Sequence, residues 1–275
     1  MKKILFSVFL FGFLSVSYAF ALDSFKPFEG VKGNLSIAGG TAHIPVVKEV
    51  SKRIMKKNSN IRITIGGGGS GVGIKKVGEG LIDIGNSGRK ASDNEIKKYG
   101  LFLYKWAVDG VAIVVNPSNK IVNLDTTTLK KIFAGDIKNW KDVGGHDDRI
   151  SVYTRDSSSG TRKVFWKKAL LKGKITDKAN FISSNGAMKT AIANDKNGIG
   201  YISIGYLDDS VKGVALNGVS PDLNNVKSGK YKVARGLYSN TKGEAKGLKK
   251  KFIDYLYTTD GQALIAEKGF IPVTK

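Results

Sequence analysis

Strand-like and helix-like segments alternate along almost the whole chain, and two of the junctions between them are loops rich in glycine and serine. Segments 34–38, 61–65 and 150–153 have the apolar or alternating pattern of strands, and helical spacing follows each of them. This alternation predicts an α/β fold with a mostly parallel sheet. In open sheets of this kind, ligands bind beyond the carboxyl ends of the strands, and both loops fall at such ends.

Further segments extend the same pattern. Pro45 marks the start of a helix with an apolar face, and a second amphipathic helix is expected near residue 250. Val111–Val115 is a continuous apolar run, which is typical of a strand buried on both faces. The remaining expected elements are strands at 81–84 and 199–204 and helices at 93–99, 126–133 and 161–171.

The first loop, at residues 66–71, is a run of glycines with Ser70 near its end. It matches the G-x-G-x-x-G dinucleotide pattern only superficially, because no acidic residue stands about 20 positions further on. A phosphate-binding P-loop is excluded, since Val72 occupies the position of its lysine. The strand–glycine–serine–helix order still favours an anion site over a simple tight turn.

The second loop, at residues 153–162, combines an arginine with hydroxyl and small side chains at the start of a helix. Unpaired backbone N–H groups and the helix dipole make such an end attractive to anions. Gly160 allows close approach of the backbone, and Ser159 and Thr161 add hydroxyl donors. Arg155 offers a forked, charge-assisted contact to two oxygens. Two such helix ends in one chain predict a tetrahedral oxyanion held between them.

Composition narrows the class of protein. Residues 1–21 have the charged start, apolar run and small-x-small end of a cleavable signal peptide, so an exported, soluble protein is expected. The chain has no cysteine, which excludes disulfides, thiolate catalysis and a lipidated N-terminal cysteine. A periplasmic location without a stable membrane anchor is therefore predicted.

Charge and histidine content exclude other classes. The net charge of +22 attracts anions, but the lysines are dispersed and no aromatic–basic motif stands among them, so nucleic-acid binding is not expected. Only seven arginines occur, and Arg89, Arg155 and Arg162 lie in or beside the glycine/serine loops. His43 and His146 are the only histidines and are far apart in sequence, so no metal site, cofactor or catalytic residue is predicted.

Several ordered segments resemble the phosphate-binding periplasmic proteins of phosphate ABC importers, in particular their shorter branch. The resemblance covers nearly the whole mature chain. Its segments are 63–71, 83–87, 155–161, 185–187, 198–201, 261–263 and 269–273.

The resemblance implies a type II bilobal periplasmic-binding-protein fold, in which two α/β domains joined by two crossover segments close over the ligand in a cleft. Domain I is expected at residues 22–110 and 205–275, and domain II at 111–204. The crossovers are expected near 108–114 and 199–206.

The resemblance also implies a set of phosphate contacts. One contact loop of the family corresponds here to Thr41 and to the backbone N–H of Ala42, and the serine of another corresponds to Ser70. The pattern Arg-x-x-x-Ser-Gly-Thr matches Arg155, Ser159, Gly160 and Thr161, and the third loop contributes Ser87 and Arg89.

This chain departs from the family at two places. Gly40 and Ala42 stand where close relatives often carry serines. Gly88 stands where the longer branch carries an aspartate that accepts the proton of hydrogen phosphate and repels sulfate. Selectivity would then require another acceptor, such as a hydroxyl or a carbonyl.

The sequence thus predicts a periplasmic receptor that binds inorganic phosphate, passes it to the membrane permease of an ABC importer, and performs no chemistry. A monomer is expected. Three alternatives stay open: a receptor for sulfate, molybdate or another tetrahedral oxyanion, a secreted phosphatase or esterase with Ser70 or Ser159 as nucleophile, and a basic surface-binding or adhesion protein on the same fold.

Overall fold

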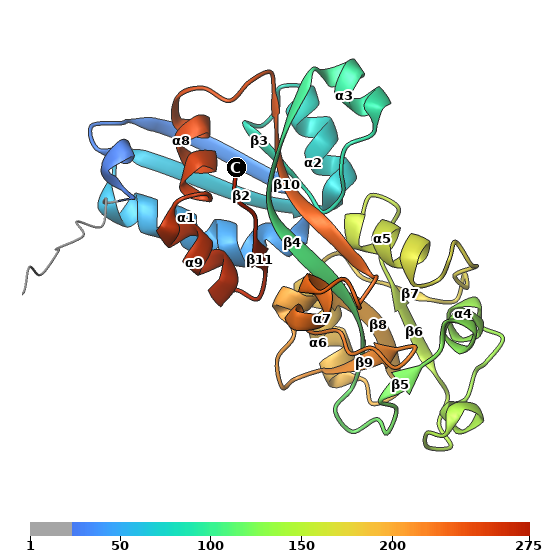
Figure 1. Ribbon diagram of the computed structural model, residues 1–275. Helices are drawn as coiled ribbons and strands as arrows, with labels where there is room; N and C mark the ends of the chain where they lie inside the picture. Colours follow the sequence, from blue (N-terminus) through green and yellow to red (C-terminus); the bar gives the residue numbers. More distant parts are fainter. Residues whose placement is uncertain (1–23) are drawn as a thin grey trace, which may run out of the picture.

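The computed structural model describes residues 24–275, so the expected signal peptide at 1–21 lies outside the described residues. Strands and helices alternate over this range, as the sequence predicts (Figure 1). Within these residues eleven strands join in one mixed sheet, in which five of the ten strand pairs are antiparallel, so the expectation of a mostly parallel sheet is wrong. Within residues 24–275, no helix has the length and apolar character needed to cross a membrane.

The first lobe contains both ends of the described chain (Figure 1). Its apolar core includes Val46, Val47, Val50 and Ile54, the residues whose spacing predicts the first helix. Its strands are β1 (Gly33–Gly39), β2 (Ile61–Gly68), β3 (Ile84–Ser87) and β11 (Ile271–Pro272), with parts of β4 (Leu101–Val115) and β10 (Ala234–Lys242). Its helices are η1 (Lys26–Phe28), η2 (Thr41–His43), α1 (Ile44–Lys57), α2 (Gly69–Gly78), α3 (Asp93–Tyr99), α8 (Gly247–Tyr255) and α9 (Thr259–Glu267).

The second lobe is built from the middle of the chain around the last five residues of β4. Val111–Val115 is fully buried, which confirms the prediction of a strand covered on both faces. Its other strands are β5 (Asn123–Leu124), β6 (Ser151–Thr154), β7 (Asn180–Phe181), β8 (Gly198–Ser203) and β9 (Lys212–Leu216). Its helices are α4 (Thr126–Ala134), η3 (Trp140–Val143), α5 (Gly160–Lys168), α6 (Asn185–Asn194), η4 (Ile204–Tyr206) and α7 (Leu223–Lys227).

Two long antiparallel strands, β4 and β10, connect the lobes (Figure 1). Residues 101–110 of β4 pair with β10, and residues 111–115 pair with β8 and, from 113 on, with β9. The main path of the sheet runs β2-β1-β3-β10-β4-β8-β6-β7. The expected crossover at 108–114 lies within β4. The second crossover between the lobes does not lie at 199–206, where it was expected.

Residues 211–233 pack with the second lobe, because Val214, Val226 and Val233 belong to its buried cluster. The first-lobe cluster resumes at Leu237, in β10. The apolar packing therefore divides the chain near 234, whereas the sequence placed the boundary of domain II at 204. The apolar run at 199–204 reflects the central position of β8 between β4 and β6 and does not mark a crossing.

One strand is also displaced from its expected position. The sequence predicts a strand at 81–84, and β3 begins at Ile84. Asp83 is held in the preceding turn, because its carboxylate accepts hydrogen bonds from the backbone N–H and the hydroxyl of Ser36 at 2.8 and 2.7 Å. Strand pairing with β1 starts at the next residue, where Ile84 lies opposite Ile37.

Candidate anion-binding site

Loops from both lobes enclose a narrow, tightly closed cavity where the lobes meet. It is lined by Gly40, Thr41, Ala42, Gly69, Ser70, Gly88, Arg155, Ser159, Gly160, Thr161 and Arg235. None of these residues is acidic. Seven of the nine residues that the sequence predicts as ligands are among them.

The segment at Gly40 follows β1 and turns directly into η2. Gly40 is required there by packing, since a Cβ atom at this position would lie 2.8 Å from two atoms of the His43 ring. His43 is fully buried, and its Nδ1 lies 2.9 Å from the Gly40 carbonyl oxygen. Burial, followed by the nearby charge of Arg235, lowers the pKa of His43 to about 3. This ring is therefore neutral and supports the loop without adding charge.

The strand–glycine–helix order is as the sequence predicts, but β2 continues to Gly68, three residues beyond the expected strand at 61–65, and α2 begins at Gly69. Gly68 and Gly69 adopt φ values of 107° and 88°, which favour glycine. They bring Ser70 into the first turn of the helix, where it is 1% exposed. The Ser70 hydroxyl oxygen accepts a hydrogen bond from the backbone N–H of Gly88 at 2.9 Å, so it can still donate its own hydrogen to a ligand.

The arginine loop connects β6 to α5. Ser159 caps α5, since its hydroxyl oxygen accepts a hydrogen bond from the N–H of Arg162 at 3.1 Å. Gly160 faces Ser70 so closely that a Cβ atom there would lie 2.0 Å from the Ser70 hydroxyl oxygen. The N-termini of α2 and α5 thus converge on one cavity from different lobes. Each end attracts negative charge, so an anion between them would be stabilised by both.

Arg155 is the most informative side chain of the cavity. It is 1% exposed, and its Nη2 donates a hydrogen bond to the Ser183 carbonyl oxygen at 2.8 Å. Its Nε and Nη1 are buried without a hydrogen-bond partner, and no carboxylate of the described chain forms an ion pair with it. Burial lowers the pKa of this guanidinium. Because an unpaired buried charge is costly, the arrangement calls for an anionic ligand.

Arg235 lines the same cavity and was not predicted. It lies on β10 directly opposite Asp109 of β4. Its Nε donates to Asp109 Oδ2 at 2.8 Å, and its Nη1 donates to the Thr161 hydroxyl oxygen at 3.0 Å. The local sequence carries no loop or motif signal at this position. The only hint is the scarcity of arginine in a chain whose cations are mostly lysine.

Asn185, at the start of α6, is a second residue that was not predicted as part of the site. Its backbone N–H and its Nδ2 donate to the Thr41 hydroxyl oxygen at 3.2 and 3.0 Å. Its Nδ2 also lies 3.4 Å from the Thr161 hydroxyl oxygen. The amide therefore orients one hydroxyl from each lobe and leaves their hydrogens free for a ligand.

Ser87 and Arg89 were predicted as ligands, but neither lines the cavity. The Ser87 hydroxyl donates to the Arg89 carbonyl oxygen at 2.8 Å and accepts from Asn240 Nδ2 at 2.9 Å. The Arg89 guanidinium binds the Glu95 carboxylate with two bonds of 2.7 Å. These two side chains fix the third loop, and Gly88 between them is the residue that faces the cavity.

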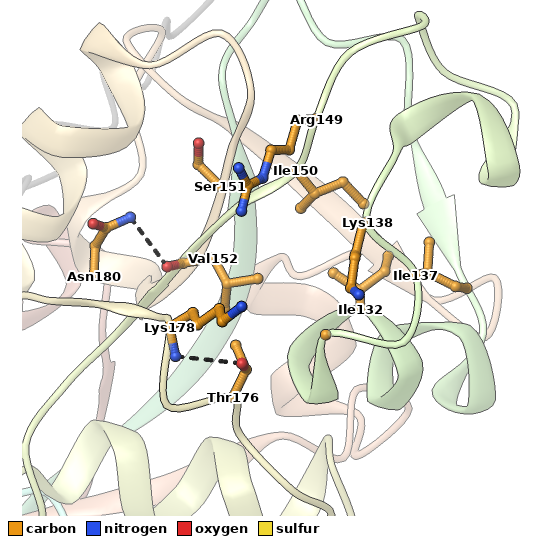
Figure 2. A pocket seen from close by; sticks show the side chains of 11 residues that line it. Ile132, Ile137, Lys138, Arg149, Ile150, Ser151, Val152, Thr176, Lys178 and Asn180 are labelled. Atoms are coloured by element: carbon orange, nitrogen blue, oxygen red, sulfur yellow. Dashed lines mark hydrogen bonds between the residues drawn. The ribbon is translucent and has the colours of Figure 1, made fainter.

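A larger cavity, of about 400 Å³, lies at the other end of β6 in the second lobe (Figure 2). Lys138, Arg149 and Lys178 surround it, and all three are exposed to solvent. The charges of these exposed side chains are solvated by water and screened by salt, whereas the buried charges of the interlobe cavity are not. Size alone therefore does not identify the binding site.

The described residues hold no group of three or more potential metal ligands. Ser70 and Ser159 each form a hydrogen bond with a backbone N–H, and no bond from either hydroxyl to a histidine or a carboxylate is found in the described part of the chain. The geometry provides donors for an anion at this site.

Comparison with known proteins agrees with this geometry. The family model described as the PBP superfamily domain matches residues 28–260. The phosphate-binding protein PstS of Bacillus subtilis is 40% identical over 92% of this chain and 85% of its own length. The chain belongs to the PBP superfamily, in its PstS branch. The predicted bilobal fold and family are confirmed.

Other PstS proteins and solved structures support the same assignment. PstS of Borreliella burgdorferi is 34% identical over 87% of this chain and 90% of its own length. A phosphate ABC transporter substrate-binding protein from Clostridium perfringens, solved with bound phosphate, has a TM-score of 0.82 and 33% identity over 88% of this chain and 100% of its own. An ABC-type phosphate transport receptor from Vibrio cholerae has a TM-score of 0.66 and 31% identity over 87% and 99%.

Proposed function

We propose that this protein is an extracytoplasmic receptor that binds inorganic phosphate and delivers it to the permease of an ABC importer. The observation that carries the proposal is Arg155, a fully buried guanidinium with two unpartnered nitrogens between two helix N-termini. Membership of the PstS branch and the phosphate in the related Clostridium perfringens structure support phosphate as the ligand.

The proposed ligands are Arg155, the hydroxyls of Thr41, Ser70, Ser159 and Thr161, and the backbone N–H groups of Ala42 and Gly160. Thr41, Ala42 and Ser70 come from the first lobe. The second lobe supplies Arg155, Ser159, Gly160 and Thr161. Binding would therefore favour the closed arrangement of the lobes, because only that arrangement brings both sets of donors to one anion. The closed pair of lobes would then be the form recognised by the permease, with a monomer as the working unit.

Direct contacts already join the lobes in this arrangement. The Tyr206 hydroxyl donates to the Thr41 carbonyl oxygen at 2.7 Å. The Ser158 hydroxyl donates to the Gly68 carbonyl oxygen at 2.8 Å, and the Gly71 N–H donates to the Ser158 carbonyl oxygen at 2.9 Å. These bonds support a receptor whose two lobes close over its ligand.

Isothermal titration of the mature, anion-stripped protein with phosphate and then with sulfate tests the proposal. Saturable phosphate binding with little response to sulfate would support a phosphate receptor. Comparable binding of both anions would change the substrate to a broader class of tetrahedral oxyanions. If neither anion bound, the proposal would fail.

Two controls separate the proposal from other classes of function. We propose that the protein performs no catalysis, so a chromogenic phosphate ester should not be hydrolysed; turnover that depends on Ser70 or Ser159 would contradict this. Salt-sensitive binding to a polyanion without saturable phosphate binding would instead favour a basic surface-binding protein.

A further inference from the structure

Arg235 occupies a position in the cavity that nothing in the local sequence explains. Its side chain is 3% exposed, and its Nη1 is bonded to Thr161, one of the proposed ligands. Nε and Nη2 both lie close to Asp109 Oδ2, at 2.8 and 2.7 Å. The guanidinium is therefore held in one orientation, with the edge that carries Nη1 turned to the cavity.

Asp109 is fully buried and serves as the support for this arginine. Its Oδ1 accepts a hydrogen bond from the Ser203 hydroxyl at 2.9 Å, and its Oδ2 faces Arg235. Burial raises the pKa of Asp109, while Arg235 and the Ser203 hydroxyl act against that increase. Asp109 is absent from the cavity lining, so the carboxylate stands behind the arginine and does not confront an anionic ligand.

Glycine at position 88 makes room for this arrangement. A Cβ atom on Gly88 would lie 2.7 Å from Arg235 Nη1 and 2.9 Å from its Cζ. Any side chain there would displace the guanidinium from its present position. The position where the longer branch is expected to carry an aspartate is thus covered by an arginine in this chain.

The charges of the cavity are unbalanced. Arg155 and Arg235 carry two positive charges and Asp109 carries one negative charge. Burial lowers the pKa of Arg155, and the charge of Arg235 adds to that effect, so the two guanidiniums repel each other. An anion in contact with both would remove this repulsion.

We propose that Arg235 is a second ligand-binding cation of the phosphate site, held in position by Asp109, and that Gly88 is the residue that admits it. This inference rests on the proposed function of the same cavity. Asp109 is a positioning residue, because it acts on the ligand only through Arg235.

The test compares Arg235→Lys and the double variant Asp109→Asn/Arg235→Gln with the unmodified protein. The double variant replaces the ion pair by two amides, which avoids a buried aspartate without its partner. Phosphate affinity is measured by titration calorimetry at mildly acidic and mildly alkaline pH, where phosphate is mainly a monoanion and mainly a dianion. Thermal unfolding of each variant shows that it is folded.

The double variant should bind phosphate about tenfold or more weakly, the loss expected for a charge-assisted hydrogen bond. Its loss of affinity should be larger at alkaline pH, because the attraction of a cation scales with the charge of the ligand. Arg235→Lys, which keeps the charge and loses the fork, should show a smaller loss. Arg155 and neutral His43, the other groups near Arg235, are unchanged in both variants.

Arg149→Gln is the matched control, since it removes the same charge from the exposed cavity shown in Figure 2 and should leave phosphate affinity unchanged. A folded double variant with unchanged affinity would overturn the inference, as would an equal loss at both pH values, which would indicate a structural role only. Failure of the unmodified protein to bind phosphate would overturn the proposed function, and this inference with it.

Discussion

At the scale of single residues, Arg155 in the loop after β6 and Arg162 in the first turn of α5 are close in sequence and differ in what they face. Arg155 lines the cavity, and Arg162 does not. Arg155→Ala should weaken phosphate binding by about a hundredfold or more, because a buried anion would lose a forked, charge-assisted partner. Arg162→Ala, which removes an equal charge from the first turn of α5, should cost little. Calorimetry that found unchanged affinity in Arg155→Ala would contradict the site.

Gly160 gives a second prediction at this scale. A methyl group at this position would overlap the Ser70 hydroxyl across the interface between the lobes. Gly160→Ala should therefore weaken phosphate binding by about tenfold or more while the melting temperature of the unliganded protein changes little. Gly186→Ala, in the first turn of α6, is a suitable control, since its Cβ atom would lie 3.6 Å from Tyr206 Cε1, an ordinary contact distance. Equal affinities of the two variants would show that the lobes do not need to meet at Gly160.

At the scale of elements, α3 shows how a short helix is fixed beside the third loop. Ser92 and Glu95 form a capping box, and Arg89 binds the same glutamate. The hydrogen bond from Arg89 is the main cause that lowers the pKa of Glu95 from 4.5 to about 2. A depressed carboxylate pKa stabilises the fold above the unfolded-state value, and this stabilisation is lost as the pH falls toward the folded-state value.

Glu95→Gln should therefore lower the stability near neutral pH, by at most about 1 kcal/mol because the pair is partly exposed to solvent. The difference from the unmodified protein should shrink as the pH falls from about 4.5 to about 2, since the glutamate is then protonated in both the folded and the unfolded state. Thermal unfolding at a series of pH values measures this. Glu79→Gln, which changes a carboxylate 3.9 Å from Lys75 on an exposed helix face, should have little effect. A difference for Glu95→Gln that stayed constant with pH would refute the explanation.

At the scale of the whole molecule, hydrogen bonds join the two lobes across the cavity. Burial raises the pKa of Tyr206 to about 12, so its hydroxyl is a neutral donor to Thr41 at physiological pH. Tyr206→Phe should weaken phosphate binding about two- to tenfold, because the bond stabilises only the closed arrangement. At subsaturating phosphate, small-angle scattering should show a larger average radius of gyration for Tyr206→Phe than for the unmodified protein.

Tyr257→Phe is the control for this prediction. The Tyr257 hydroxyl donates to the Lys105 carbonyl oxygen at 3.0 Å within the first lobe, so its loss does not affect contact between the lobes. This variant should bind phosphate with unchanged affinity. Equal effects of the two substitutions would show that Tyr206 contributes only to the stability of its own lobe.

Features that depend on a few neighbouring residues could be predicted from the amino-acid sequence alone. The strand–glycine–helix order at 66–71 and the Ser159 cap of α5 are set by local backbone preferences and by hydrogen bonds three residues apart. The apolar run Val111–Val115 is also a local signal, because its composition alone predicts that the strand is buried. These signals were sufficient to predict two helix ends suited to an anion, and the resemblance to a family added the bilobal arrangement.

Which polar side chains reach the cavity depends on contacts between residues far apart in sequence, and these appear only in the folded chain. Arg89 lies in a loop that favours an anion site, yet it binds Glu95 instead. Arg235 lines the cavity because the pairing of β10 with β4 places it opposite Asp109, 126 residues away in sequence. Asn185 likewise meets Thr41 across 144 residues. Such partners are brought together by strand pairing and by the closure of the lobes. A buried donor binds whichever acceptor the fold places beside it, and no local pattern encodes that choice.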